Sequence, residues 1–535
     1  MWVKGWREKA WKNLESEWDM IIIGGGITGA GIFRMAAKAG IRVLLLEKND
    51  FAFGTSSRSS KLIHGGLRYL RNYQFNVTYE SVNQREKLLR DAKYLVNPIL
   101  FLLPIYESYH TSSKKIKFSL FLYDLFGKKK AHGEISANEI TQQNPLLSKS
   151  GLIKSFYYFD AVVDDARLVL RNIQEGTFVG GTALNYINVI KLIPSERNKI
   201  IGVVARQNMD GNKEEKKLFS RVIINATGPW TDEIRKQVSS RKIIRKLRGS
   251  HIQFSQNRLP IDQALSIFHP KDGRSLFVIP WAGITLVGTT DLDHNPDYEK
   301  KHPEPYMSSA EECYLLEAVN HYFPEINLSH KDIISSFSGL RPIVSSGGND
   351  PSKESRKEVI LEEQGLFTIT GGKLTTYGEM AYKLLRAVRA NMPNTTLQFN
   401  KNIKLLDLPP NKIQNSYLSS ERINKFKGKF GKLTQNFLDF SKPEELELIK
   451  RTGFCLAELR WAAKYESVCH LDDLLLRRSR LGLLLPNGGL GMEKEVRKTI
   501  QTELGWDDQR WERELSRYRK IWVGCYFSQK VEEEG

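Results

Sequence analysis

The sequence predicts an α/β protein with three parts: a domain built on a parallel sheet, an inserted domain with a mixed sheet, and a helical C-terminal domain. The apolar run Met20–Ile23 breaks into glycines and leads through a helical stretch to a second strand that ends at Glu47. This is the strand–helix–strand order of a parallel sheet. From Arg241 to about Phe337, strand-like runs alternate with turn residues, which indicates antiparallel strands. Beyond a linker that contains Pro409-Pro410, the chain reads as helical.

The length of 535 residues allows two or three domains, and the 26% charged and 41% hydrophobic residues are typical of a globular protein. The four cysteines form no C-x-x-C pair, so we expect reduced thiols and no metal site. The expected boundaries are an amphipathic N-terminal helix (1–18), a first domain (19–400), an inserted domain (about 90–160 and 240–337), a linker (401–416) and a helical C-terminal domain (417–535).

The glycines after the first strand carry a dinucleotide-binding pattern. Gly24, Gly26 and Gly29 stand in G-x-G-x-x-G register directly before a helical stretch. Such a turn lets a pyrophosphate approach the backbone at the helix N-terminus, where N–H groups are free. Glu47 follows about 20 residues later, where a carboxylate binds an adenosine ribose and would repel a 2′-phosphate. The pattern predicts a dinucleotide other than NADP, and by itself leaves FAD and NAD open.

Three further stretches point to the same site. Thr55–Leu70 is rich in Ser and Thr and continues with a histidine, two glycines and an Arg-Tyr pair. Such a stretch suits a backbone that passes close to a polar ligand. Val222–Pro229 reads as a buried strand that ends in small residues. Phe367–Tyr377 reads as a strand, a Gly-Gly turn and a helix start, which is a second anion-binding N-terminus.

The net charge of +19 would suit binding to nucleic acid, to an anionic membrane or to an anionic substrate, and charge alone does not distinguish among these partners. No apolar run reaches the roughly 18 residues that a transmembrane helix needs, and residues 1–18 lack the apolar core of a signal peptide. Tryptophans recur along one face of that stretch, at Trp2, Trp6 and Trp18. The stripe predicts either an interfacial membrane helix or a helix packed on the body of the protein. Lys114–Lys130 offers a similar pair of alternatives, a membrane-dipping aromatic segment or a core helix with solvated lysine ends.

Together these motifs resemble the FAD-dependent glycerol-3-phosphate dehydrogenases. The resemblance runs from about Asp19 to Leu485 and excludes the N-terminal stretch and the C-terminal tail. The matching stretches are Ile22–Gly31, Thr55–Leu70, Val163–Val169, Asn225–Trp230, Gly249–Ile252, Phe277–Trp281, Gly288–Asp291, Ser338–Pro342, Gly371–Tyr377 and Leu471–Leu485.

The resemblance implies a Rossmann-like, glutathione-reductase-like FAD domain with a substrate domain inserted in it. It also implies oxidation of sn-glycerol 3-phosphate to dihydroxyacetone phosphate, with electrons passed to membrane quinone. A related group delivers the electrons to oxygen and is longer by an inserted segment, for which this sequence has no obvious room. The dehydrogenase is therefore favoured over the oxidase.

From the turns and the resemblance together, we expect a set of residues to contact FAD through backbone or side-chain atoms. These residues are Gly24, Gly26, Ile27, Thr28, Gly29, Glu47, Lys48, Thr55, Ser56, Ser57, Ser60, Lys61, Leu62, His64, Gly65, Gly66, Ala226, Thr227, Gly228, Gly371, Gly372, Lys373, Leu374 and Thr375.

The substrate that the resemblance implies is a phosphomonoester, which arginine and lysine bind best. Arg68, Arg341 and Lys373 stand in glycine-flanked turns, and Tyr69 offers a hydroxyl. By resemblance, Arg341 also lies near the reacting carbon and stabilises the alkoxide that forms there.

The C2 hydroxyl must lose its proton to a group that titrates near neutrality, and histidine is the side chain of choice. The candidates are His251 and His64. We prefer His251 because the inserted domain should cover the substrate, and we expect His64 to position the flavin ring.

Electrons bound for quinone must leave at a bilayer surface. We therefore expect a cytoplasmic protein bound peripherally to the inner face of the cell membrane through an anionic surface. A homodimer is left open. A basic nucleic-acid-binding flavoprotein is the alternative from another class, but no basic-aromatic motif supports it, and nucleic acid is not an expected partner.

Overall fold

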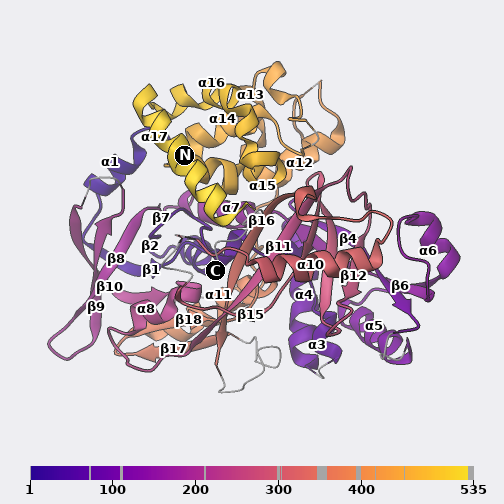
Figure 1. Cartoon of the computed structure of the whole chain (residues 1–535). Helices are drawn as coiled ribbons and strands as arrows, with labels where there is room; N and C mark the ends of the chain where they lie inside the picture. Colours follow the sequence, from indigo (N-terminus) through magenta and orange to yellow (C-terminus); the bar gives the residue numbers. More distant parts are fainter. Residues whose placement is uncertain are drawn as a thin grey trace.

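The computed structural model describes residues 2–71, 74–108, 113–209, 213–297, 302, 304–345, 358–392, 399–415, 417–450 and 452–527. Its strands form two sheets of eight and ten strands, and most helices of the C-terminal third gather on one side of both (Figure 1). The predicted α/β class, the mixed sheet and the helical C-terminal part are confirmed.

The first sheet contains the predicted parallel core. Strand β1 pairs in parallel with β2 and with β10, so that Met20 lies opposite Val43 and Val222. Helices α2, α7 and α11 cover one face of these strands, and strands β8 and β9 with α1 pack on the other, so that apolar residues are buried on both faces. The strands are β1 (Glu17–Ile23), β2 (Val43–Leu46), β7 (Thr182–Leu184), β8 (Ile187–Pro194), β9 (Ile200–Gln207), β10 (Glu215–Asn225), β17 (Val359–Glu363) and β18 (Leu366–Thr370).

The second sheet is assembled from two separate parts of the chain. Strands from residues 62–163 and strands from residues 244–344 meet where β4 and β12 pair in parallel, while the other pairs in this sheet are antiparallel. The strands are β3 (Leu62–Ile63), β4 (Val96–Tyr106), β5 (Gly133–Ser136), β6 (Leu152–Val163), β11 (Ile244–Ser255), β12 (Ala264–Phe268), β13 (Ser275–Trp281), β14 (Ile284–Gly288), β15 (Leu292–Asp293) and β16 (Ile333–Val344).

Helix α2 lies at the centre of the first domain and packs between α7 and α11. Its small residues allow this close packing, and the chain leaves the helix at Gly40 with φ of 78°. The helices outside the C-terminal part are α1 (Trp6–Lys12), α2 (Ile27–Lys38), α3 (Leu67–Arg71), α4 (Phe75–Asp91), α5 (Ser113–Gly127), α6 (Ala137–Gln143), α7 (Asp165–Thr177), α8 (Thr231–Arg235), α10 (Ser309–Tyr322) and α11 (Tyr377–Val388).

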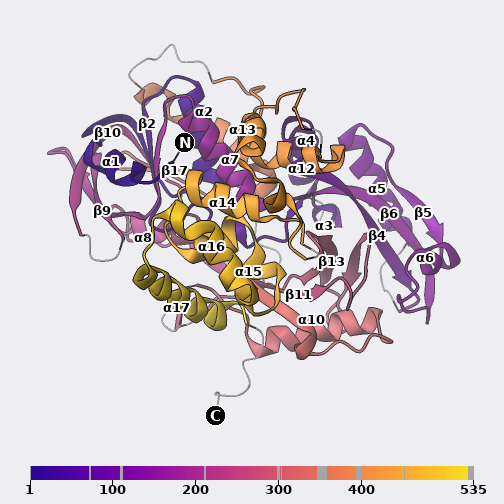
Figure 2. The same cartoon turned by 90° about the horizontal axis from the view of Figure 1, so that it is seen from above.

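The C-terminal helices lie against α7 and β16 (Figures 1 and 2). Residues 399–415 carry no helix or strand. The helical elements after them are α12 (Ser420–Phe430), α13 (Thr434–Phe440), α14 (Leu456–Tyr465), a π-helix (Asp473–Arg478), α15 (Leu481–Leu484), α16 (Glu493–Leu504) and α17 (Asp508–Cys525).

The N-terminal stretch differs from the predicted amphipathic helix of residues 1–18. Helix α1 spans only Trp6–Lys12, and Trp18 belongs to β1. The side chains of Trp2, Trp11 and Trp18 are buried, and the ring centroid of Trp2 lies 5.6 Å from that of Phe51. Pairing of β1 with β10 overrides the helical period there. These tryptophans therefore pack on the body of the protein, which is the second of the two alternatives that the stripe left open.

Helix α5 carries the second aromatic segment, and part of that segment is exposed, unlike the buried N-terminal tryptophans. It buries Ile116, Leu120 and Tyr123, whereas Phe118, Phe121 and Leu125 are 60%, 54% and 59% exposed. Exposed lysines flank this apolar face at residues 114, 115 and 117 and at residues 128–130. Among the described residues, no helix is long and apolar enough to cross a membrane.

Candidate active site

A cavity of about 1060 Å³ lies between the two sheets. The carboxyl ends of β1, β10 and β18 open into it from one side, and strands of the second sheet, including β11, β13 and β16, close it from the other. Ligands of doubly wound sheets bind at the carboxyl ends of the parallel strands. The cavity therefore occupies the place that the glycine pattern predicted.

The turn after β1 lies very close to the backbone after β10 and to the first turn of α2. Gly24 has φ of 111°, and a Cβ atom there would lie 2.6 Å from the carbonyl oxygen of Ala226. A Cβ atom on Gly29 would lie 1.9 Å from the carbonyl oxygen of Gly24. Side chains at these two positions would push α2 off the strands, so the N-terminus of α2 faces the cavity only because both residues are glycine.

Glu47 holds this turn in place at the cavity wall. Its carboxylate accepts hydrogen bonds from the backbone N–H of Gly25 at 2.6 Å and of Asn49 at 2.8 Å. Burial raises the pKa of Glu47, and the two backbone hydrogen bonds oppose that rise. The carboxylate thus lies beside the glycine turn, where a ribose hydroxyl would meet it.

The structure brings most predicted site residues to one cavity. Those that line it are Gly24, Gly26, Ile27, Thr28, Glu47, Lys48, Thr55, Ser56, Ser60, Leu62, His64, Gly66, Tyr69, Ala226, Thr227, Gly228, His251, Arg341, Gly371, Gly372, Lys373, Leu374 and Thr375.

Four predicted cofactor residues lie outside the cavity lining. Gly29 lies in the first turn of α2 against the carbonyl of Gly24, and the buried Ser57 uses its carbonyl to accept a hydrogen bond from Lys61 Nζ at 2.6 Å. The side chain of Lys61 is fully buried and pairs with Asp165 at 2.9 Å. The N–H of Gly65 donates to the hydroxyl of Tyr123 at 2.7 Å. The side chain of Arg68 lies outside the described residues.

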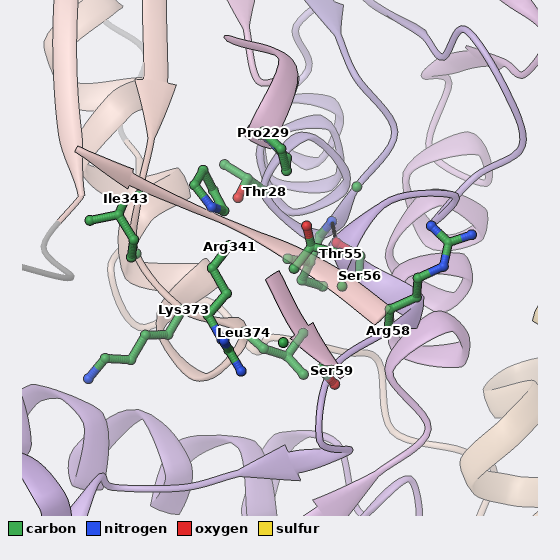
Figure 3. Close-up of a pocket in the computed structure, with 18 of the residues that line it drawn as sticks. Thr28, Thr55, Ser56, Arg58, Ser59, Pro229, Arg341, Ile343, Lys373 and Leu374 are labelled. Carbon is green, nitrogen blue, oxygen red and sulfur yellow. Dashed lines mark hydrogen bonds between the residues drawn. The ribbon is translucent and has the colours of Figure 1, made fainter. Parts of the chain in front are cut away.

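Arg341 projects into the cavity from β16 (Figure 3). Its guanidinium donates to the Asp291 carboxylate at 3.0 Å and to the Thr289 hydroxyl at 2.9 Å, and its side chain remains 22% exposed. Arg274 pairs with the same carboxylate at 3.2 Å and also lines the cavity. Two arginines around one carboxylate leave a net positive charge at this end of the site.

Lys373 approaches the cavity from the turn after β18 (Figure 3). Its ammonium group donates to the hydroxyl of Ser81 at 3.0 Å and lies 3.7 Å from the ring centroid of Tyr69. The aromatic face holds the cation in place without neutralising it.

His251 is 2% exposed at the second-sheet wall of the cavity. Its Nε2 atom lies 2.8 Å from the hydroxyl oxygen of Ser60, and its ring stacks on Phe337 with centroids 4.7 Å apart. Burial, and then the positive charges of Arg341 and Lys61, hold the pKa of His251 well below 6.5. The imidazole is therefore neutral at pH 7 and can accept a proton. His64 lines the same cavity and is less buried.

Sequence reasoning missed Arg274 and Asp291 as cavity residues. Arg274 follows an Asp-Gly turn before β13, and Asp291 ends the Gly288–Asp291 motif, but no local pattern places the two beside Arg341. Arg58 also borders the cavity, yet Figure 3 shows its guanidinium directed away from Arg341. It donates to the hydroxyl of Tyr526 at 3.0 Å and pairs with Glu304.

Several known proteins resemble this chain in sequence or in fold. Residues 19–377 match the FAD dependent oxidoreductase family, and residues 407–511 match the C-terminal domain of alpha-glycerophosphate oxidase. The aerobic glycerol-3-phosphate dehydrogenase of Bacillus subtilis is 39% identical over 378 residues, which are 70% of this chain and 67% of that protein. The solved glycerol-3-phosphate dehydrogenase of Bacillus halodurans, complexed with FAD, has a TM-score of 0.77 at 26% identity and covers 100% of both chains. The FAD-bound L-alpha-glycerophosphate oxidase of Mycoplasma pneumoniae shares the fold, with a TM-score of 0.57 at 17% identity over 72% of this chain and 98% of that one.

Proposed function

The chain belongs to the FAD-dependent glycerol-3-phosphate dehydrogenases of the aerobic type, and we propose that it passes the electrons of sn-glycerol 3-phosphate to a membrane quinone. The proposed reaction moves a hydride from C2 of the substrate to N5 of FAD and releases dihydroxyacetone phosphate. The observation that carries the proposal is the convergence of Arg341, Lys373 and His251 on one cavity with the glycine turn.

FAD is the cofactor of this family, and the residues of this cavity fit it. Gly26 is the N-cap residue of helix α2 and offers no side-chain cap, and the N–H of Ile27 donates to the hydroxyl of Ser56 at 2.9 Å. The N-terminus of the helix lines the cavity, where its dipole favours a pyrophosphate. In the described part of the chain, the buried hydroxyl of Thr370 has no hydrogen-bond partner, and Thr370 lines the cavity. When bound, FAD supplies the two-electron acceptor for the hydrogen on C2.

The substrate's phosphate fits the cationic end of the cavity. A phosphomonoester carries nearly two negative charges, and a guanidinium binds it through two parallel hydrogen bonds. Arg341, Arg274 and Lys373 supply the positive charge there. We propose that Arg341 also stabilises the alkoxide at C2, with Tyr69 and Arg68 as further substrate contacts.

His251 is the proposed base for the C2 hydroxyl. Its neutral imidazole has one unprotonated ring nitrogen, which can accept a proton, while the stack on Phe337 fixes the plane of the ring and the contact between Nε2 and the Ser60 hydroxyl fixes its direction. The positive charge of Arg341 close by favours the alkoxide and opposes a lasting imidazolium. His64 is the alternative base, and its position in the cavity lining also suits contact with the flavin ring.

Anaerobic addition of sn-glycerol 3-phosphate should bleach the flavin of the purified holoenzyme. Reoxidation should then be faster with a soluble quinone analogue than with air-saturated buffer, because the dehydrogenase reading assigns the electrons to quinone. Rapid-mixing absorbance near 450 nm measures both steps, where oxidised flavins absorb (roughly). Absence of bleaching would exclude glycerol 3-phosphate as the substrate. Faster reoxidation by oxygen would favour the oxidase.

We propose that α5 is the part of the chain that touches the membrane. Its exposed Phe118, Phe121 and Leu125 form an apolar face between lysines, and Phe75 and Tyr79 of α4 are also exposed. Apolar side chains framed by lysine suit an anionic headgroup layer, where each basic residue contributes about 1 kcal/mol. Phe118 and Ile116 also line the cavity, so electrons would leave near this surface.

Changing Phe118, Phe121 and Leu125 together to Ser should abolish co-sedimentation with anionic vesicles at low salt. Changing Lys128, Lys129 and Lys130 together to Glu should weaken it, because the charges near the lipid would then repel. The matched control changes Lys494, Lys498 and Lys520 to Glu; these lysines are exposed on α16 and α17, away from α5. Equal loss in the control would show that net charge alone governs binding. Indifference of the intact protein to anionic vesicles would refute the membrane proposal.

A further inference from the structure

The C-terminal domain inserts buried arginines into the first domain. Arg477 and Arg478 both donate to the carboxylate of Asp50, at 2.6 and 2.7 Å, and all three side chains are at most 1% exposed. Burying three charges is costly unless each is fully paired. The junction between the two domains is therefore fixed by directed ion pairs rather than by apolar packing alone.

Arg480 makes the ion pairs that reach toward the active site. Its guanidinium donates to the Asp164 carboxylate at 2.8 Å, to the backbone oxygen of Ser57 at 3.3 Å, and to the Asp165 carboxylate. The side chain of Arg480 is 1% exposed, and that of Asp165 is fully buried. The C-terminal domain thus contacts the base of the loop that carries Ser56 and Ser60 into the cavity.

Asp165, which Arg480 contacts, is itself hydrogen-bonded to the loop. Its carboxylate accepts hydrogen bonds from the N–H of Ser59 at 3.1 Å, from the hydroxyl of Ser59 at 2.6 Å and from Lys61 Nζ at 2.9 Å. Lys61 has φ of 61°, a conformation that a non-glycine residue keeps only when its surroundings hold it. Ser60, between these two anchored residues, presents its hydroxyl to His251.

Lys61 also faces the ring stack of the proposed base. Its ammonium lies 4.8 Å from the ring centroid of Phe337, which stacks on His251. The charged groups that act on His251 are Lys61 from the loop and Arg341 from β16, which pairs with Asp291. Strand β14 opposes the imidazole with the uncharged Gly288. Burial lowers the pKa of Lys61 to about 8, and the Asp165 carboxylate opposes this decrease, so Lys61 is mostly charged at pH 7.

We propose that Arg480 is a positioning residue of the C-terminal domain, which holds Asp165 and thereby fixes Ser60 and the Lys61 charge against His251. This inference rests on the proposed function, because it takes His251 as the base. The C-terminal helical domain would then complete the active site rather than only cap it.

The test compares the variants R480M, R480K and K61M with R167M in the FAD-loaded full chain. Arg167 is the matched control, because it is also buried and pairs with Glu466 at the same domain junction; within the described residues its guanidinium bonds to Glu466 and to the backbone oxygen of Arg478 rather than to Asp165 or the loop. Anaerobic flavin reduction by sn-glycerol 3-phosphate is measured against pH. The pKa of His251 is measured separately by NMR of labelled histidine, with H251N to assign the signal.

R480M and R167M should lower the unfolding temperature, but only R480M should slow flavin reduction, by about 10- to 100-fold as expected for a displaced catalytic group. Losing Arg480 loosens the Asp165 contact that holds Lys61, and losing Lys61 removes a positive charge that acts on His251. Its NMR pKa and the acid limb of the reduction rate should therefore both move to higher pH in R480M and in K61M. R480K keeps the charge and should recover part of the rate.

The proposal is overturned if R480M and K61M keep the wild-type rate and His251 pKa, or if R167M changes them as much. Should R480M not fold, R480K and K61M decide by the same two measurements. Failure of the proposed function looks different, since wild-type flavin would then not be reduced by sn-glycerol 3-phosphate, whatever the NMR titration gives.

Discussion

Replacing Arg341 by Ala should lower kcat/KM for sn-glycerol 3-phosphate by about 10²- to 10³-fold, the range for losing one partner of a desolvated charge pair. The loss should appear in both parameters. KM should rise because the phosphate loses its guanidinium, and kcat should fall because the alkoxide at C2 loses a nearby positive charge. FAD content should stay at the wild-type level, since Arg341 bonds to Thr289, Thr290 and Asp291 rather than to the glycine turn.

Arg245 offers the matched control for this change. It lies on the neighbouring strand β11 and pairs with the exposed Asp293 at 2.6 Å, outside the cavity. R245A therefore removes the same charge from the same sheet and should leave the kinetics near wild type. Glycerol, which lacks the phosphate, separates the two roles: a kcat loss that persists with glycerol is due to the reacting carbon. Unchanged kinetics in R341A would remove Arg341 from the site.

Replacing His251 by Asn should slow flavin reduction by about 10²- to 10⁴-fold, the usual contribution of a general base. The wild-type rate should also show a specific pH dependence. Burial, Arg341 and Lys61 hold the pKa of His251 well below 6.5, and only the neutral imidazole accepts a proton. The rate should therefore stay level through pH 6.5 and fall only at more acidic pH, as the lowered pKa of His251 is approached. H251N should lose this acid limb.

The control for His251 is His269, a buried histidine beyond the end of β12 that stacks on Tyr314 and does not line the cavity. H269N tests whether losing any buried imidazole slows the reaction, and it should not. If H251A and H251N both keep wild-type kcat across pH, His251 is not the base. The same experiment on His64 then becomes the decisive one.

The sequence predicted the parts of the site that depend on local pattern. The Gly24–Gly29 turn, Glu47 and the Gly371–Thr375 turn each follow a strand, and chain geometry alone sends the ends of parallel strands to one edge of a sheet. Their meeting in one cavity was therefore predictable. Arg341 was predicted from its charge and an expected glycine-flanked turn, and His251 from its titration range and an expected covering domain, with the resemblance beside both. Local spacing does not show that they lie within strands, β16 and β11, that face the glycine turn.

The remaining features depend on partners that are distant in the chain. Arg477, Arg478 and Arg480 look like a solvated charge run, but carboxylates more than 300 residues away pair with them and allow their burial. A role for Arg274 is apparent only in the folded structure, where it pairs with Asp291. The tryptophan stripe has a helical period, yet pairing of β1 with β10 takes Trp18 into a strand. Tertiary contacts override local patterns at each of these points.

The parallel contact between β4 and β12 has a consequence for how the chain is made. On the ribosome, residues 96–163 emerge about 100 residues before residue 264, which at about 10 residues per second is a delay of some ten seconds. During that interval the edge of β4 that later meets β12 at Phe101 and Leu102 lacks this partner, and an unpaired apolar edge is a template for mispairing. Nascent chains halted between residues 170 and 260 should therefore depend on chaperones more than chains halted after residue 345.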